Sequence, residues 1–221
     1  MSSIKLVHDY FVERYPVRIF VPFAVVIAVA GIAAGGSLPT IRDVVIRCVL
    51  AYTLVLVFRI ADDLVDLRTD RLRHPGRVLV RASNVTPIVV LALVIAGGDI
   101  IIILSQPHPS ARLAVFSSIS LFLGCWYLLR ARLHAGPLAN AHVLLIKYPV
   151  ISLLTCASWD GLTLHTALPS FGTIYLGLCI YEQLHDHAVR VSRGGTWIFA
   201  AEVSLLACIS LLMFSTGGAL Q

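Results

Sequence analysis

Long, mostly apolar runs separated by short polar stretches are the feature that most constrains how this chain folds. A helix that crosses a bilayer needs about 20 such residues. Seven runs approach or reach this length, at residues 19–36, 43–61, 85–105, 112–130, 138–158, 168–186 and 196–216. Because backbone groups in lipid must be paired within their own segment, and because these runs do not alternate as barrel strands do, we expect helices. The sequence predicts an all-α integral membrane protein with about seven transmembrane helices, in one domain over residues 19–221.

The composition agrees with a lipid-facing surface rather than with a soluble core. The chain of 221 residues is 58% hydrophobic and 13% charged, whereas a soluble domain carries about 25% charged residues. The net charge of +5 could indicate nucleic acid, but the basic residues lie between apolar runs and no aromatic residues are interleaved with them. The five cysteines lie inside apolar runs without ligand spacing, so we interpret them as small hydrophobic residues. We therefore expect a lipid bilayer, and not nucleic acid, around this protein.

Residues 1–18 precede the first run and form a predicted interfacial segment, in which Ile4, Val7, Phe11 and Tyr15 recur at helical spacing. Lysines and arginines collect in this segment and after the second, fourth and sixth runs, whereas the loops on the other side are poor in them. Cytoplasmic loops carry the excess of positive charge. The sequence thus predicts a multi-pass protein with its N-terminus in the cytoplasm and its C-terminus outside.

Four aspartates at the end of the second run are the strongest functional signal. Asp62, Asp66 and Asp70 recur at i, i+4 and i+8, which places them on one helix face, with Asp63 beside them. Carboxylates so close together repel one another unless a cation neutralises them, and the dipole opposes acids at a helix C-terminus. Oxygen ligands of this kind suit Mg²⁺. We predict a magnesium site here; the alternative is a solvated helix end whose aspartates pair with nearby arginines.

A second acidic pair, Glu182 and Asp186, ends the sixth run at the same membrane level as the first cluster. Carboxylates on two helices can hold two or more Mg²⁺ across a diphosphate, so we expect the second and sixth helices to be neighbours, with Asp66 and Asp186 facing one cavity. The alternative is that these acids pair with Arg190 and Arg193. Basic residues near the clusters are candidate partners for a diphosphate: Arg59, Arg77, Arg81 and Lys147. Arg47, which also lies in the second run, is expected to pair with Asp43 at i−4.

A family resemblance rests on one stretch of the chain. The stretch reads Asp62-Asp63-x-x-Asp66-x-x-x-Asp70, followed by His74-Pro75-x-Arg77-x-x-x-Arg81. It resembles the first aspartate-rich motif of the UbiA superfamily of intramembrane prenyltransferases. The resemblance implies a helical bundle around a cytoplasm-facing cavity, with a second acidic motif after the sixth helix, where this chain has Glu182 and Asp186. Members usually have nine spans and more aspartates in the second motif, so this chain resembles a short, divergent member.

The resemblance and the local chemistry together predict a Mg²⁺-dependent prenyltransferase (EC 2.5.1 type) that moves a prenyl group from a prenyl diphosphate to an acceptor. Asp62, Asp63, Asp66 and Asp70 are the predicted catalytic residues and, with Glu182 and Asp186, the predicted metal ligands. A membrane terpene cyclase would use the same metal site, and a catalytically reduced carrier or scaffold would fit the smaller second motif. A CDP-alcohol phosphotransferase is disfavoured, because the aspartate cluster lacks the Asp-Gly and Ala-Arg pairs of that class.

Overall fold

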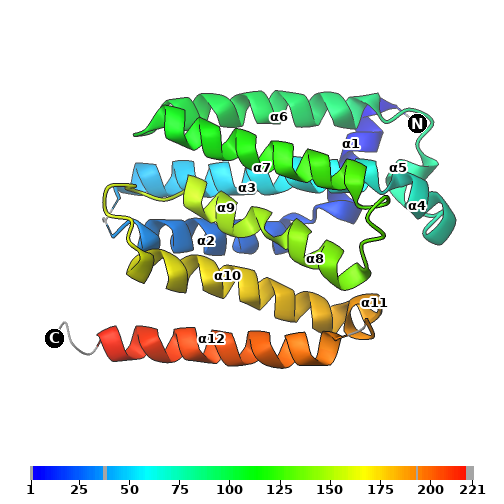
Figure 1. The fold of residues 1–221 in the computed structure, drawn as a ribbon. Helices are drawn as coiled ribbons and strands as arrows, with labels where there is room; N and C mark the ends of the chain where they lie inside the picture. Colours follow the sequence, from blue (N-terminus) through cyan, green and yellow to red (C-terminus); the bar gives the residue numbers. More distant parts are fainter. Residues whose placement is uncertain (1, 37–38, 193, 218–221) are drawn as a thin grey trace.

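A computed structural model describes residues 2–36, 39–192 and 194–217, and side chains up to residue 211. All elements in these ranges are helices, which confirms the all-α prediction. They are α1 (Ser3–Arg14), α2 (Val17–Ala34), α3 (Ile41–Val65), α4 (Leu67–Arg73), α5 (Val78–Arg81), α6 (Thr86–Leu104), α7 (Pro109–Leu129), α8 (Pro137–Leu145), α9 (Lys147–Leu154), α10 (Leu164–His185), α11 (His187–Arg190) and α12 (Gly195–Gly217). The long helices lie side by side along one axis (Figure 1), and the short helices α1, α4, α5 and α11 gather at one end of the bundle.

Five segments are long and apolar enough to cross a membrane: α2, α3, α6, α7 and the combined stretch Pro137–Leu154 of α8 and α9. They coincide with the first five predicted runs. Many of their aliphatic side chains are exposed, as lipid-facing residues are, and mean hydropathy reaches 2.7 in α6. The sixth and seventh predicted runs form α10 and α12, which are not among these five. The structure therefore indicates a helical membrane protein with several spans.

Helix α2 holds the middle of the bundle together, because it packs against α3, α9 and α10. Its contact with α9 is close: a Cβ at Gly31 would lie 2.2 Å from the Ser152 carbonyl oxygen. The Ser152 hydroxyl also donates a hydrogen bond of 2.9 Å to the Ile27 carbonyl, so a small residue and a polar residue join the two helices, as is common in membranes. Both α2 and α9 pack against α3 and against α10. Among the described residues, α3 and α10 are not one of the closely packed helix pairs, so the close packing predicted for the second and sixth helices is not observed.

The fifth predicted run is a kinked pair of helices rather than one straight helix. Helix α8 ends at Leu145 and α9 begins at Lys147, with Ile146 at the join. Pro149 explains the break, because proline has no N–H for the carbonyl four residues earlier and its ring clashes with that carbonyl. The break puts Lys147, which is only 2% exposed, at the bend.

At the end of the bundle opposite the short helices α1, α4, α5 and α11, two buried arginines bind carbonyls at and just after the C-terminus of α9. Arg47 donates to the carbonyls of Thr155 (2.9 Å) and Cys156 (2.5 Å). Arg112, which is fully buried, donates to those of Leu154 (2.6 Å) and Cys156 (2.9 Å). Carbonyls at a helix C-terminus lack partners within the helix and attract cations.

The predicted pairing of Arg47 with Asp43 is consequently wrong. Asp43 forms a capping box with Thr40 at the start of α3, and this uses its carboxylate. The guanidinium of Arg47 is instead held by the carbonyls at the end of α9.

Candidate functional site

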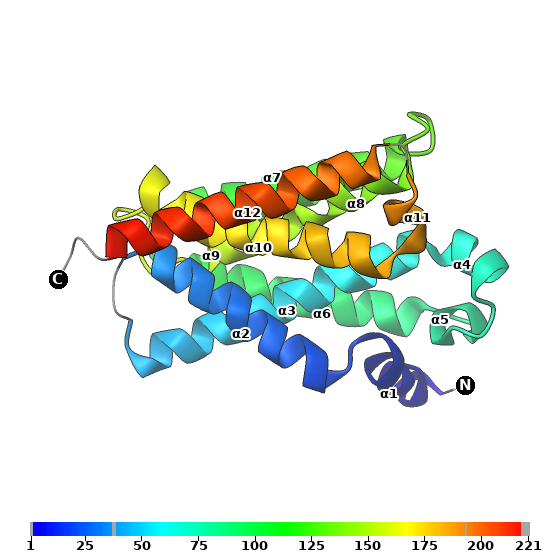
Figure 2. The ribbon, with the colours of Figure 1, turned by 90° about the horizontal axis from the view of Figure 1, so that it is seen from below.

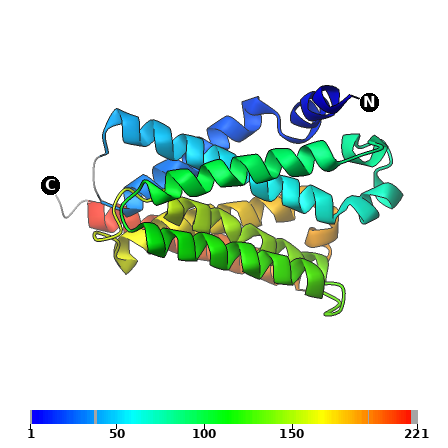
Figure 3. The same cartoon turned by 90° about the horizontal axis from the view of Figure 1, so that it is seen from above.

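The aspartate-rich segment lies at the end of the bundle where α1, α4, α5 and α11 gather, as Figure 3 shows from above. Helix α3 runs to Val65, Asp66 joins it to α4, and helical hydrogen bonds continue through the joint, from Asp66 N to Asp62 O (3.0 Å) and from Asp70 N to Asp66 O (2.8 Å). The predicted helical register of these aspartates is thus retained. Their side chains, however, reach four different sets of partners.

Asp62 lies in the interior of this end of the bundle. Its two carboxylate oxygens accept hydrogen bonds from the Tyr127 hydroxyl of α7 and from the Lys147 ammonium of α9. The side chains of Asp62 and Lys147 are only 14% and 3% exposed. Lys147 therefore points toward the aspartate cluster, as the sequence interpretation requires, but in this structure it neutralises Asp62.

Asp63 connects the cluster to helix α1. It accepts hydrogen bonds from the Tyr10 hydroxyl (3.0 Å) and from Nε of Arg14 (3.2 Å), and Arg14 makes a second, ionic contact with it. Arg59 lies 3.5 Å away on the same helix as Asp63. Burial, together with the neighbouring Asp63 carboxylate, raises the pKa of Tyr10, so the phenol stays a donor. Helix α1 is thus more than an interfacial segment, because it supplies two partners of the motif.

Asp66 and Asp70 pair with arginines nearer the surface. Arg130, which follows α7, lies 2.5 Å from Asp66, and Arg77, which precedes α5, lies 2.5 Å from Asp70. The sequence predicts that a bound cation neutralises these four carboxylates; in the structure each aspartate has a basic side chain as its partner. Pairing of this kind is what the helix-end alternative anticipated, although the partners of Asp62 and Asp63 come from distant helices.

The loop after the motif is fastened to α1 by Glu13. One carboxylate oxygen of Glu13 accepts a hydrogen bond of 3.0 Å from the backbone N–H of Val78, and the other lies 3.8 Å from Arg81. Arg77 and Arg81, both predicted to bind a diphosphate, thus face carboxylates in this structure. Their guanidinium groups are nevertheless at the same end of the bundle as the aspartates.

The second acidic pair does not form a single helical face. Helix α10 ends at His185, and Asp186 has an extended backbone with ψ of 110°. Its exposed carboxylate caps α11 by accepting from the Ala188 N–H (2.7 Å). Glu182 is half-buried and lies within range of the charges of Arg59 and Lys147. Only Glu182 is therefore brought toward the first cluster; Arg193, an alternative partner for these acids, lies outside the described residues.

Sequence reasoning missed Tyr10, Arg14, Tyr127 and Arg130 as members of this site. Tyr10 and Arg14 are four residues apart on one face of a short amphipathic helix, which is a readable signal, but nothing in the sequence says what that face meets. Tyr127 and Arg130 end the fourth predicted run, where they are explained equally well as interfacial residues. We call the aspartates and their basic partners the charged end of the bundle; it comprises Asp62, Asp63, Asp66, Asp70, Arg14, Arg59, Arg77, Arg130 and Lys147.

Comparison of the chain with family models, with curated proteins and with solved structures finds no match in any of the three. The resemblance of the aspartate-rich stretch to the UbiA superfamily therefore stays a prediction. The case for a function rests on the residues and geometry of the charged end.

Proposed function

We propose that this protein is a Mg²⁺-dependent intramembrane prenyltransferase that uses the charged end of the bundle to bind a prenyl diphosphate. One observation carries the proposal: four aspartates and five basic groups converge on one end of an otherwise apolar bundle. Asp63, Asp70 and Lys147 among them are buried. Ionisable residues are costly in a membrane protein and mark functional sites by default.

The donor set fits Mg²⁺. Its ligands are carboxylate oxygens, which magnesium prefers together with the oxygens of a substrate phosphate. Within the described residues, one oxygen of Asp66 and one of Asp70 accept no hydrogen bond. The oxygens of Asp62 and Asp63 are already occupied by basic and phenolic donors. These four aspartates would hold the metal, with Glu182 the nearer acid of the second pair and Asp186 more remote.

The basic partners give the site a way to exchange ligands without leaving charges unpaired. With magnesium and a diphosphate bound, the aspartates would hold the metal, and Lys147, Arg59 and Arg77 would bind phosphate oxygens, which arginine and lysine bind well. Bound magnesium would stabilise the charge that develops on the leaving diphosphate. The apolar helices beside the charged end would take the prenyl chain, and their side chains would keep water from the reacting carbon.

Release of diphosphate from a series of prenyl diphosphates, with and without Mg²⁺, tests this proposal. A transferase needs an added acceptor for turnover, whereas a membrane terpene cyclase forms a product without one. Absence of release under every condition would overturn both enzymatic proposals.

A catalytically reduced carrier or scaffold is the second candidate, and the complete pairing of the four aspartates favours it. In a scaffold the ion pairs would hold α1, α3, α7 and α9 together and nothing would replace them. A carrier would bind a prenyl diphosphate without releasing diphosphate, and a scaffold would bind neither metal nor diphosphate.

For the topology, we propose seven spans, with α10 and α12 crossing the membrane in addition to the five long apolar segments, and the N-terminus in the cytoplasm. The turn between α4 and α5 and the loop between α9 and α10 lie at opposite ends of the bundle (Figure 2). Reporter fusions at residues 75 and 162 should therefore report opposite sides of the membrane, the cytoplasm for residue 75. The same side for both fusions would contradict this topology.

A further inference from the structure

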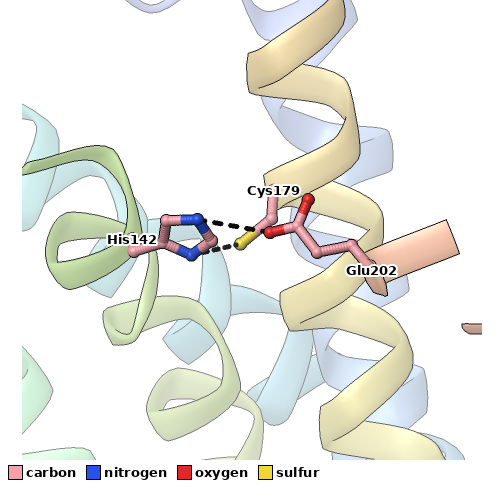
Figure 4. Close-up of side chains that lie close together, drawn as sticks. All are labelled: His142, Cys179 and Glu202. Carbon is pink, nitrogen blue, oxygen red and sulfur yellow. Dashed lines mark hydrogen bonds and ion pairs between the residues drawn. The ribbon is translucent and has the colours of Figure 1, made fainter. Parts of the chain in front are cut away.

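Three potential metal ligands from three helices meet between α8, α10 and α12 (Figure 4). They are His142 of α8, Cys179 of α10 and Glu202 of α12, and one ligand atom from each lies within 4.8 Å of the other two. Cys179 and Glu202 are buried, at 2% and 6% exposure, and His142 is half-buried. None of these residues belongs to the aspartate-rich motif.

Neighbouring side chains orient two of these ligands. The Tyr175 hydroxyl lies 3.0 Å from Nδ1 of His142, and Gln183 donates a hydrogen bond of 2.7 Å to Oε2 of Glu202. The two ring nitrogens of His142 face the other two ligands: Nδ1 lies 3.5 Å from the Cys179 sulfur, and Nε2 lies 3.3 Å from Oε1 of Glu202. In metal sites a ligating carboxylate is typically held through its other oxygen, as Gln183 holds Glu202 here.

One of the ligand atoms is buried without a hydrogen bond. Among the described residues, Oε1 of Glu202 accepts none, although it lies near Nε2 of His142. A buried carboxylate oxygen without a partner is costly. A cation between Glu202, His142 and Cys179 would remove that cost, because all three could then act as ligands.

We propose that His142, Cys179 and Glu202 bind a transition-metal ion, with Zn²⁺ as the best match. A thiolate, an imidazole and a carboxylate are the ligand types that zinc takes, and three protein ligands leave one position for water. Magnesium prefers oxygen ligands alone, so this site is chemically distinct from the charged end of the bundle. The ion would clamp α12 to α8 and α10. The proposal does not depend on the proposed enzymatic function.

The test is the metal content of the full-length protein, purified in detergent without a histidine tag after growth with zinc. We expect about one zinc per chain for the wild type, retained through a wash with a weak chelator. Cys208→Ser, an exposed cysteine on α12, and His165→Gln, an exposed histidine on α10, are matched controls and should keep the metal. Cys179→Ser, His142→Gln and Glu202→Gln should each lose it, or bind it more than about tenfold more weakly.

Co²⁺ substitution supplies a second readout, which reports thiolate ligation in the wild-type protein itself and so does not rest on the folding of a variant. The wild type loaded with Co²⁺ should show thiolate-to-metal charge-transfer absorption, which Cys208→Ser keeps and Cys179→Ser loses. The proposal would be overturned if the wild-type protein held no zinc after zinc loading. It would also be overturned if Cys179→Ser and Cys208→Ser had equal metal content. Either result would leave a plain polar contact between His142 and Glu202.

Discussion

Replacing Lys147 with methionine should lower the free energy of unfolding by about 3–5 kcal/mol, the cost of removing one partner of a buried ion pair. The Asp62 carboxylate, 14% exposed, would keep only the Tyr127 hydroxyl. Asp62→Asn should cost a similar amount, because it leaves the Lys147 ammonium without a counter-charge. The double variant should be more stable than the sum of the two single losses predicts, since neither charge is then left alone.

Unfolding of the purified protein in mixed detergents measures these differences. Arg81→Met is the control, because Arg81 lies 3.8 Å from Glu13 with 62% of its side chain exposed. Exposed pairs contribute roughly 0–1 kcal/mol, so this variant should unfold almost as the wild type does. Small and additive losses for Lys147→Met and Asp62→Asn would show that the buried pair is not formed.

Asp66→Ala should reduce magnesium-dependent diphosphate release by roughly 10²–10³-fold, the usual scale for removing one group that stabilises developing charge. The same change should cost less than about 1 kcal/mol of stability, since the Asp66 side chain is 41% exposed and pairs with Arg130 near the surface. The Asp66→Ala variant therefore distinguishes an effect on diphosphate release from an effect on stability.

Asp63→Ala does not separate the two roles, because Tyr10 and Arg14 would both lose the carboxylate that holds them. Asp160→Ala is the matched control for Asp66→Ala: Asp160 is 80% exposed and contacts His108, away from the charged end. Unchanged turnover in Asp66→Ala, with lowered stability, would support a scaffold instead.

The helices were predictable because the length of an apolar run reflects the thickness of a bilayer. The run at 85–105 is α6 (Thr86–Leu104), and the run at 112–130 is α7 (Pro109–Leu129). Pro149 causes the kink in the fifth run, but the length and hydrophobicity of a run do not reveal where a proline breaks the helix. Helix termini differ from the predicted ones by a few residues where a capping residue sets the start of the helix. At Thr40, for example, a capping box starts α3 two residues before the predicted run.

The partners of the charged residues were not predictable in the same way. Spacing along one helix suggested that Asp62, Asp63 and Asp66 share a cation, and that Arg47 pairs with Asp43. In the structure each of these groups meets a partner from another part of the chain: Lys147 for Asp62, Arg14 for Asp63, Arg130 for Asp66 and the α9 carbonyls for Arg47. A one-dimensional pattern gives the residue types at a site, but the packing of α1, α7 and α9 decides which of them touch.

The buried cluster of His142, Cys179 and Glu202 shows the same limit. Each residue taken alone reads as a small hydrophobe or as an isolated polar group within an apolar run. Only the packing of α8, α10 and α12 brings the three together. Polar residues that lie far apart in the sequence, on different apolar runs, can therefore form one cluster when the helices pack.

The melting temperature of the wild-type protein with Mg²⁺ and a series of prenyl diphosphates tests the central claim most directly. Binding to the folded state alone stabilises by about 2.7 kcal/mol at a hundredfold excess over the dissociation constant. We expect the melting temperature to rise with both components together, and Asp66→Ala to lose that rise while Asp160→Ala keeps it. A wild-type melting temperature that is indifferent to Mg²⁺ and to prenyl diphosphates of every chain length would contradict the account.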